Sequence, residues 1–373
     1  MKRWTLLAIT AVLAVIALVT ALVSGPATDP DTAAAPAPAP VPAPTTTTPP
    51  PPPAPPSWLH TLGPGESPPQ FVLFSFDGAG SDAHWQRILP LARRSNAHVT
   101  AFLTGLYLVP DRESTRYTGP GHRPGASSVG FGGSEADVAR RIENLTAARA
   151  DGHEIGTHFN GHFCAGSEPS GGTWSTAQWN DELDQFFRFL REAPGLDLPA
   201  TAVQGGRTPC LESQPGKLYP ALLAHGMSYD SSGVAGSLAW PSLVDGVWEF
   251  PMPTVTVPAL NKRVVMMDYN FWYSMNKARN EPQRAAQFTD WTVQAYERAY
   301  AAAFAGNRAP LVVGNHFNDW NGSAFSTAAE RFLGDVCLRP ETVCATYGEV
   351  IAWMGMQDPA VLGALAAKPR PSP

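Results

Sequence analysis

Short apolar runs alternate with amphipathic helical patterns along most of this 373-residue chain, and that alternation limits the folds it can adopt. Apolar runs bounded by turn residues are typical of strands, whereas an apolar period of about 3.6 residues is typical of helices. The strand-like runs cover residues 71–76, 98–103, 153–157, 202–204, 227–229, 247–252, 264–267 and 311–313, and the helical patterns cover 83–94, 135–150, 176–191 and 285–304. This order predicts an α/β fold of parallel strands with covering helices, as an open sheet or a barrel.

Polar residues stand at or just beyond the ends of five of these runs: Asp77, His158, Arg207, Asp230 and His316. The carboxyl ends of parallel strands meet at one rim, where α/β proteins build their active sites. Singly, Asp77 could be a helix cap, Arg207 a surface ion pair and Asp230 a turn residue. Their coincidence at five strand ends favours one functional site.

Two of the nine histidines, His158 and His162, stand four residues apart in the segment 151–162. If the backbone turns helically there, both side chains share one face and can hold one ion. Imidazole suits zinc and its first-row neighbours. The pair therefore predicts a metal site with His158 and His162 as ligands.

The N-terminal region predicts export. Lys2 and Arg3 precede an apolar run over 6–23 that is long enough to cross a bilayer, and no strong cleavage site follows it. We expect residues 1–24 to be an uncleaved signal anchor, with a cleaved signal peptide as the alternative. Residues 25–57 are rich in Ala, Pro and Thr, and such a segment forms an extended linker rather than a core.

The remaining residues predict one catalytic domain over 58–358, followed by a tail over 359–373, on the extracytoplasmic side of the membrane or in the cell wall. The chain carries a net charge of −6 and no basic block after Arg3, which argues against nucleic acid as a partner. We expect a monomer.

The cysteines predict two disulfides, because an even number in an exported chain is typical of a disulfide-bonded protein. Cys337 and Cys344 flank a short loop that contains a proline, which makes them natural partners. By elimination, Cys164 pairs with Cys210.

Taken in order, these motifs resemble those of the polysaccharide deacetylase family, the NodB-homology domain of carbohydrate esterase family 4. Residues 152–158 with His162 resemble the second motif of that family, and residues 75–77 resemble the start of its first. Residues 207–209, 229–232 and the run ending in His316 resemble the later motifs. The resemblance covers about 71–354. It implies a distorted parallel barrel and metal-dependent removal of acetyl groups from N-acetylated sugars.

The resemblance also implies roles for these residues. Asp77 would act as general base and His316 as general acid. Arg207 would keep Asp77 ionised, with Asp230 supporting the network. His158 and His162 would hold a divalent ion, expected to be zinc, with cobalt or manganese as alternatives.

One departure from the family pattern concerns the metal. Gly78 stands where the family carries a second aspartate as third ligand. Asp82 is the nearest substitute in sequence, and Asp77 itself or the more distant Asp268 are alternatives. A milder departure is Phe159, where the family has Ser or Thr.

Trp320 and Trp272 are candidates for a sugar-stacking platform. The leading hypothesis is a membrane-tethered N-deacetylase acting on a cell-envelope glycan such as peptidoglycan. Two alternatives are an O-acetyl polysaccharide esterase and a glycan-binding pseudoenzyme that has lost the acid at Gly78.

Overall fold

The computed structural model describes residues 56–373. The expected signal anchor (1–24) and the expected linker up to residue 55 therefore lie outside the described residues. Within 56–373, no single helix is long and apolar enough to cross a membrane. Only the pair α8 (Tyr347–Met356) and α9 (Pro359–Ala367), bent by 118° at its junction, reaches the necessary length and composition.

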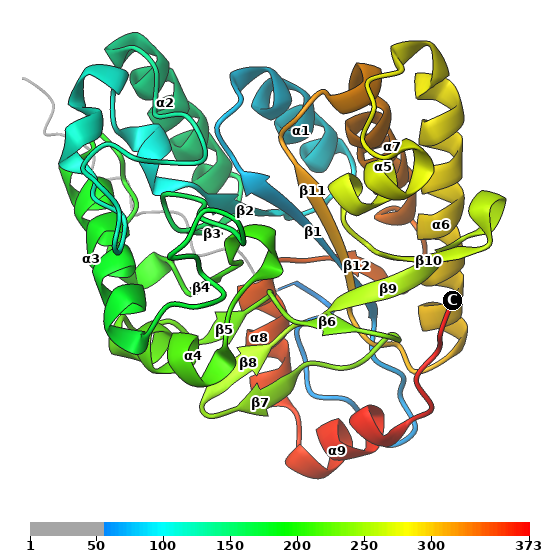
Figure 1. Cartoon of the computed structure of the whole chain (residues 1–373). Helices are drawn as coiled ribbons and strands as arrows, with labels where there is room; N and C mark the ends of the chain where they lie inside the picture. The colour runs from blue at the N-terminus through cyan, green and yellow to red at the C-terminus, as the bar shows by residue number, and fades with distance from the viewer. Residues whose placement is uncertain (1–55) are drawn as a thin grey trace, which may run out of the picture. The chain divides into compact units, whose positions relative to one another are not determined.

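A nine-stranded sheet forms the centre of the described domain, in the order β11-β1-β2-β3-β4-β5-β8-β7, with β12 beside β1 (Figure 1). Every neighbouring pair is parallel except β7 and β8. The strands are β1 (Gln70–Gly78), β2 (Thr100–Leu103), β3 (Glu154–Thr157), β4 (Gly205–Gly206), β5 (Tyr229–Asp230), β7 (Ser242–Val244), β8 (Val247–Glu249), β11 (Leu311–His316) and β12 (Thr342–Cys344).

A second, three-stranded sheet curls the first one toward closure. It consists of β6 (Val234–Ala235), β9 (Met252–Val257) and β10 (Lys262–Val265), in the order β10-β9-β6. Just beyond β10, Met267 forms a parallel bridge to Gly314 of β11. In the main sheet, β11 is the edge strand at the end away from β7. The expected distorted parallel barrel is thus confirmed as a curled, incompletely closed sheet.

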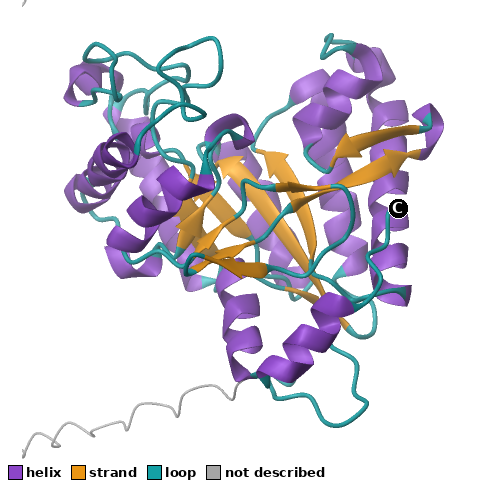
Figure 2. Cartoon of the chain, turned by 60° about the horizontal axis from the view of Figure 1, so that its bottom comes forward, coloured by secondary structure: helices purple, strands orange, loops and turns teal. Residues whose placement is uncertain are grey.

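Helices surround this sheet, as Figure 2 shows in purple around the orange strands. Besides α8 and α9 they are α1 (Asp82–Arg94), α2 (Glu135–Ala150), α3 (Thr176–Glu192), α4 (Pro215–Ala224), α5 (Asp268–Asn276), α6 (Ala285–Ala305) and α7 (Trp320–Val336). Capping boxes at Ser134, Ser175 and Thr346 fix the first turns of α2, α3 and α8. The helices expected at 135–150 and 176–191 begin where these caps stand.

Strand β1 is apolar on both faces because both are covered. Val72, Phe74 and Phe76 pack in a cluster with α1, α6 and α7. Phe71 and Leu73 belong to another cluster that contains residues of α8. Burial on both sides explains why this run has no polar alternation.

Both expected disulfides are confirmed. Cys337, just after α7, is bonded to Cys344 at the end of β12, and Cys164 is bonded to Cys210 across 46 residues. The residues expected to form a tail contain α9, and the backbone oxygen of Pro373 accepts hydrogen bonds from Thr256 in β9. Residues 359–373 are therefore part of the packed fold.

Replacing Phe74 by alanine should destabilise the domain strongly. The side chain is fully buried, and its ring centroid lies 5.8 Å from that of Phe332 in α7. We expect the free energy of unfolding to fall by ~3–5 kcal/mol, measured by urea denaturation. As a control, Leu243→Ala on β7, where the side chain is 58% exposed, should change stability by less than ~0.5 kcal/mol. Equal effects of the two substitutions would contradict this assignment of the core.

Candidate active site

A cavity of about 770 Å³ opens at the carboxyl ends of the central strands. Its lining includes Asp77, His158, His162, His316 and Trp320. The strand register places these positions at the same height along neighbouring strands. Asp77 of β1 is opposite His316 of β11. Gly78 of β1 is in register, across β2 and β3, with Gly206 of β4, the residue before Arg207. Another cavity, of about 630 Å³, lies between residues 56–69 and β12, and none of the expected site residues lines it.

Asp77 and Arg207 form a buried ion pair in which Nη1 of Arg207 donates to Oδ1 of Asp77 at 2.8 Å. The other guanidinium nitrogens donate to the carbonyl and hydroxyl of Ser231 and to the hydroxyl of Tyr347. Burial alone would raise the pKa of Asp77. The charge of Arg207 lowers it instead. Asp77 is therefore held as a carboxylate.

His158 presents an unprotonated ring nitrogen to the cavity. Its Nδ1 lies 2.8 Å from the carbonyl oxygen of Arg207, which can only accept, so Nδ1 carries the proton. Its Nε2 is buried and has no hydrogen-bond partner among residues 56–373. Burial, with the nearby His162 and His316, lowers the pKa of His158 to about 3. Burial and His316 also lower the pKa of His162. Both imidazoles are neutral, as metal ligands must be.

The backbone does not turn helically over His158 and His162. Residues 158–162 form a loop in which Phe159 and His162 have φ values of 56° and 54°. The imidazole rings of His158 and His162 nevertheless lie side by side, with their centroids 5.4 Å apart. Glu182 of α3 fixes this loop, because its Oε1 accepts hydrogen bonds from the backbone NH groups of Asn160 and Gly161. Phe159 is buried against Trp179, which accounts for an aromatic side chain there.

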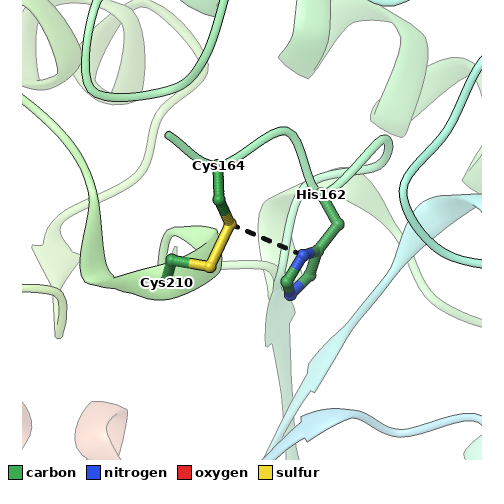
Figure 3. A group of neighbouring side chains, drawn as sticks. All are labelled: His162, Cys164 and Cys210. Atoms are coloured by element: carbon green, nitrogen blue, oxygen red, sulfur yellow. Dashed lines mark hydrogen bonds between the residues drawn. A yellow bond between two sulfur atoms is a disulfide. The ribbon is translucent and has the colours of Figure 1, made fainter. Parts of the chain in front are cut away.

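The Cys164–Cys210 disulfide flanks His162 (Figure 3). Nδ1 of His162 lies 3.7 Å from Sγ of Cys164. In the described part of the chain, these three residues are the one His/Cys/Asp/Glu group whose ligand atoms all lie within 4.8 Å of one another. Because both sulfurs are in the disulfide, neither is a thiolate ligand. The bridge instead ties the loop of His162 to the loop that follows Arg207.

His316, at the end of β11, is paired with Asp268 at the start of α5. Nδ1 of His316 lies 2.7 Å from Oδ1 of Asp268, and its backbone NH donates to Oδ2 at the same distance. Burial alone would lower the pKa of His316, but the charge and hydrogen bond of Asp268 raise it. The sequence predicts Asp268 only as a distant alternative for the third metal ligand, not as the partner of His316. Its place directly after the run 264–267 is the same strand-end pattern that identified the other residues.

Asp82 does not reach the histidines, which corrects its expected role as third ligand. It is the first residue of α1, and its Oδ1 accepts hydrogen bonds from Asn144 of α2 and from Gln86. It is absent from the lining of the main cavity and borders a smaller one beside α2. The helix start fixes its carboxylate toward α2.

Asp230 is buried but does not contact Asp77 or Arg207. Its Oδ1 accepts from the hydroxyl of Ser232, which in turn accepts from the backbone NH of Thr208. Burial, followed by the negative charge of Glu249, raises its pKa well above the usual value. Asp230 thus positions the loop after Arg207, rather than the carboxylate of Asp77.

Gly78 lies beside the ring of Tyr107 and has a backbone conformation that favours glycine. Gly78 has φ +87°, and a Cβ there would lie 3.5 Å from Cε2 of Tyr107. An aspartate at this position would be strained and would meet the Tyr107 ring.

The two tryptophans differ in position. Trp320 lines the cavity, and its ring centroid is 5.0 Å from that of His316. Trp272 stacks behind Trp320, with their ring centroids 5.4 Å apart.

No family model matches the sequence, and no curated protein matches it. The fold of the chain is similar to that of several solved structures. A protein described as a polysaccharide deacetylase from Mycobacterium smegmatis is 16% identical, with a TM-score of 0.49 over 81% of this chain and 97% of the other. A family 4 carbohydrate esterase from Streptomyces lividans, in complex with acetate, is 13% identical, with a TM-score of 0.40 over 76% and 95%.

A family 4 carbohydrate esterase pseudoenzyme from Bacillus anthracis is also similar. It is 13% identical, with a TM-score of 0.42 over 78% of this chain and 66% of the other. These structural neighbours are described by the same family that the sequence motifs resemble.

Replacing Asp268 by asparagine should lower the pKa of His316, because the imidazolium loses the carboxylate that stabilises its charge. The shift is measurable by NMR titration of the imidazole resonances. His60 and His98, which are paired with Glu66 and Glu349 away from this cavity, should titrate as in the wild type. An unchanged pKa for His316 would contradict the assigned pairing.

Proposed function

We propose that this chain is a hydrolase that removes acetyl groups from N-acetylated sugars of a polysaccharide. One observation carries the proposal: a carboxylate kept ionised and a histidine whose protonated form is stabilised line the same cavity, on paired positions of β1 and β11. Two titratable groups with opposite pKa shifts are the arrangement that acid–base catalysis requires.

The two groups divide the proton transfers of amide hydrolysis. Asp77 accepts a proton from the water that attacks the acetyl carbon, and Arg207 keeps it ionised for that purpose. His316, oriented by Asp268, which stabilises its protonated form, donates a proton to the sugar nitrogen as the bond between that nitrogen and the acetyl carbon breaks. The products are acetate and an amine. An amine leaves poorly unless it is protonated, so the His316–Asp268 pair supports amide cleavage in particular.

The residues present fit a divalent metal ion. His158 has a buried, unpartnered Nε2 at the cavity, and His162 is a second neutral imidazole beside it. Zinc is our first assignment, and cobalt or manganese are the alternatives. Such an ion, when bound, polarises a carbonyl and lowers the pKa of a bound water. Asp77 is the single carboxylate in the described lining and is assigned as the base, so we expect weak metal binding by the two histidines alone.

The proposed substrate is a glycan of the cell envelope, such as peptidoglycan. The N-terminal apolar run and the Pro-rich segment support a chain tethered on the extracytoplasmic side, whose catalytic domain works as a monomer within the wall. Trp320, at the cavity beside His316, supplies an aromatic face for the acetylated sugar, and Trp272 supports it from behind.

Two other functions remain as outcomes of the test. An O-acetyl esterase would use the same cavity, although an alkoxide leaving group depends less on His316. A glycan-binding pseudoenzyme is favoured by one observation: Gly78 supplies no ligand, and Asp82 faces α2.

Asp77→Asn should reduce acetate release by at least about 100-fold, the usual scale of general-base catalysis. The assay uses acetylated glucosamine oligomers and peptidoglycan, with added zinc, cobalt or manganese. Asp82→Asn is the matched control and should retain activity, because its carboxylate lies outside the cavity. Acetate release that is equal in wild type and Asp77→Asn would refute the proposed base.

His158→Ala should abolish metal binding, because it removes the buried imidazole and leaves one histidine. Elemental analysis after dialysis against zinc gives the stoichiometry. His225→Ala is the control, since that ring hydrogen-bonds to Asp184 and Ala221 away from the cavity. Unchanged zinc in His158→Ala would remove this residue from the metal site.

A further inference from the structure

Helix α5 carries the two most exposed aromatic side chains of the described residues. Tyr269 is 44% exposed and Tyr273 is 49% exposed. They stand four residues apart, so both lie on one face of the helix, and their ring centroids are 6.5 Å apart at an interplanar angle of 26°. Two neighbouring aromatic rings open to solvent mark a binding surface more often than a packing surface.

These rings continue the aromatic lining of the cavity. Trp320 lies 5.0 Å from His316, Tyr269 lies 5.5 Å from Trp320, and Tyr273 follows Tyr269 along the helix. Tyr269 and Trp320 themselves line the cavity, whereas Tyr273 lies beyond it. Each step between ring centroids is comparable with the length of one sugar unit. The rings of Trp320, Tyr269 and Tyr273 therefore lead from the proposed acid outward over α5.

The helix that carries the tyrosines is firmly anchored. Phe271 is fully buried, and Asp268 at the start of the helix is bonded to His316. On the same helix, Trp272 stacks on Trp320 and donates its Nε1 proton to the carbonyl of Arg279. Because the scaffold is already ordered, a ligand on the tyrosines costs little additional conformational entropy.

The chemistry of the surface suits a sugar chain. A pyranose ring has an apolar C–H face that stacks on an aromatic ring, and a tyrosine hydroxyl can hydrogen-bond to the sugar hydroxyls at the ring edge. The ammonium of Lys277 lies 4.7 Å from the centre of the Tyr273 ring, which adds a donor beside it. An apolar peptide or a lipid would use neither polar group.

We propose that Tyr269 and Tyr273 form an outer subsite that binds the pyranose units next to the one in the cavity, so that the chain selects polymers over single sugars. This proposal rests on the proposed function, because it places the acetylated unit beside His316. Binding of units remote from the reacting bond contributes to transition-state stabilisation, so longer substrates should also react more efficiently.

The test measures binding separately from chemistry. Oligomers of N-acetylglucosamine with two and six units are titrated into the full chain by calorimetry, with a chelator present so that turnover is suppressed. The wild type should bind the hexamer more tightly than the dimer. Tyr273→Ala should weaken hexamer binding about 3- to 10-fold, the scale of one aromatic contact, and reduce the ratio of hexamer to dimer affinity.

Two further variants separate stacking from other effects. Tyr273→Phe keeps the aromatic face and should restore hexamer affinity to within about twofold of the wild type. Leu243→Ala, at an exposed site on β7, should bind as the wild type does. If Tyr273→Ala leaves the hexamer affinity unchanged, or if hexamer and dimer bind equally to the wild type, the outer subsite is refuted.

The same titrations distinguish this inference from the proposed function. Hexamer binding that depends on Tyr273, without acetate release in the metal-loaded assay, would support the subsite and refute the deacetylase. Acetate release whose kcat/KM is independent of oligomer length would support the deacetylase and refute the subsite.

Discussion

The buried ion pair between Arg207 and Asp77 is the interaction on which the rest of the site depends. Removing two charges from water costs several kcal/mol per ion, and only a well-made network offsets it. Here the guanidinium also donates to Ser231 and Tyr347, and its backbone carbonyl accepts from His158. One residue thereby connects β1, β3, β4, β5 and α8. The same contacts that compensate the buried charge also set the protonation of Asp77 and the tautomer of His158.

The fold and most of the site follow from a simple pattern in the sequence. Apolar runs that end in a polar residue identify strands whose carboxyl ends converge. This pattern predicts Asp77, His158 and His316, which line one cavity, and Arg207, which is bonded to Asp77. The inference works because strand register is set by apolar burial, so each strand end is specified locally. The curl of the sheet is less local, since it depends on a bridge between Met267 and Gly314.

What the sequence could not predict depends on contacts between distant segments. Asp268 pairs with His316 across 48 residues, and only packing of α5 against β11 brings them together. Asp82 was assigned to the metal because it is near in sequence, but the first turn of α1 directs it to α2. A helical turn would bring the two histidines together by spacing alone, but the structure has a loop with positive φ values that is held by Glu182 of α3. The spacing of residues along the sequence predicts none of these contacts.

The disulfide between Cys164 and Cys210 makes the geometry of the cavity less dependent on the short strands beneath it. Its two cysteines lie beyond β3 and β4, which meet in the sheet only at Thr157 and Gly206. The disulfide joins the chain beyond β3 covalently to the chain beyond β4, whereas the two strands themselves share this single pair of residues. Because of this bond, the loops of His162 and Arg207 stay together even if the short β3–β4 pairing beneath them opens. The position of His162 relative to Arg207 is therefore fixed by a covalent bond as well as by the sheet.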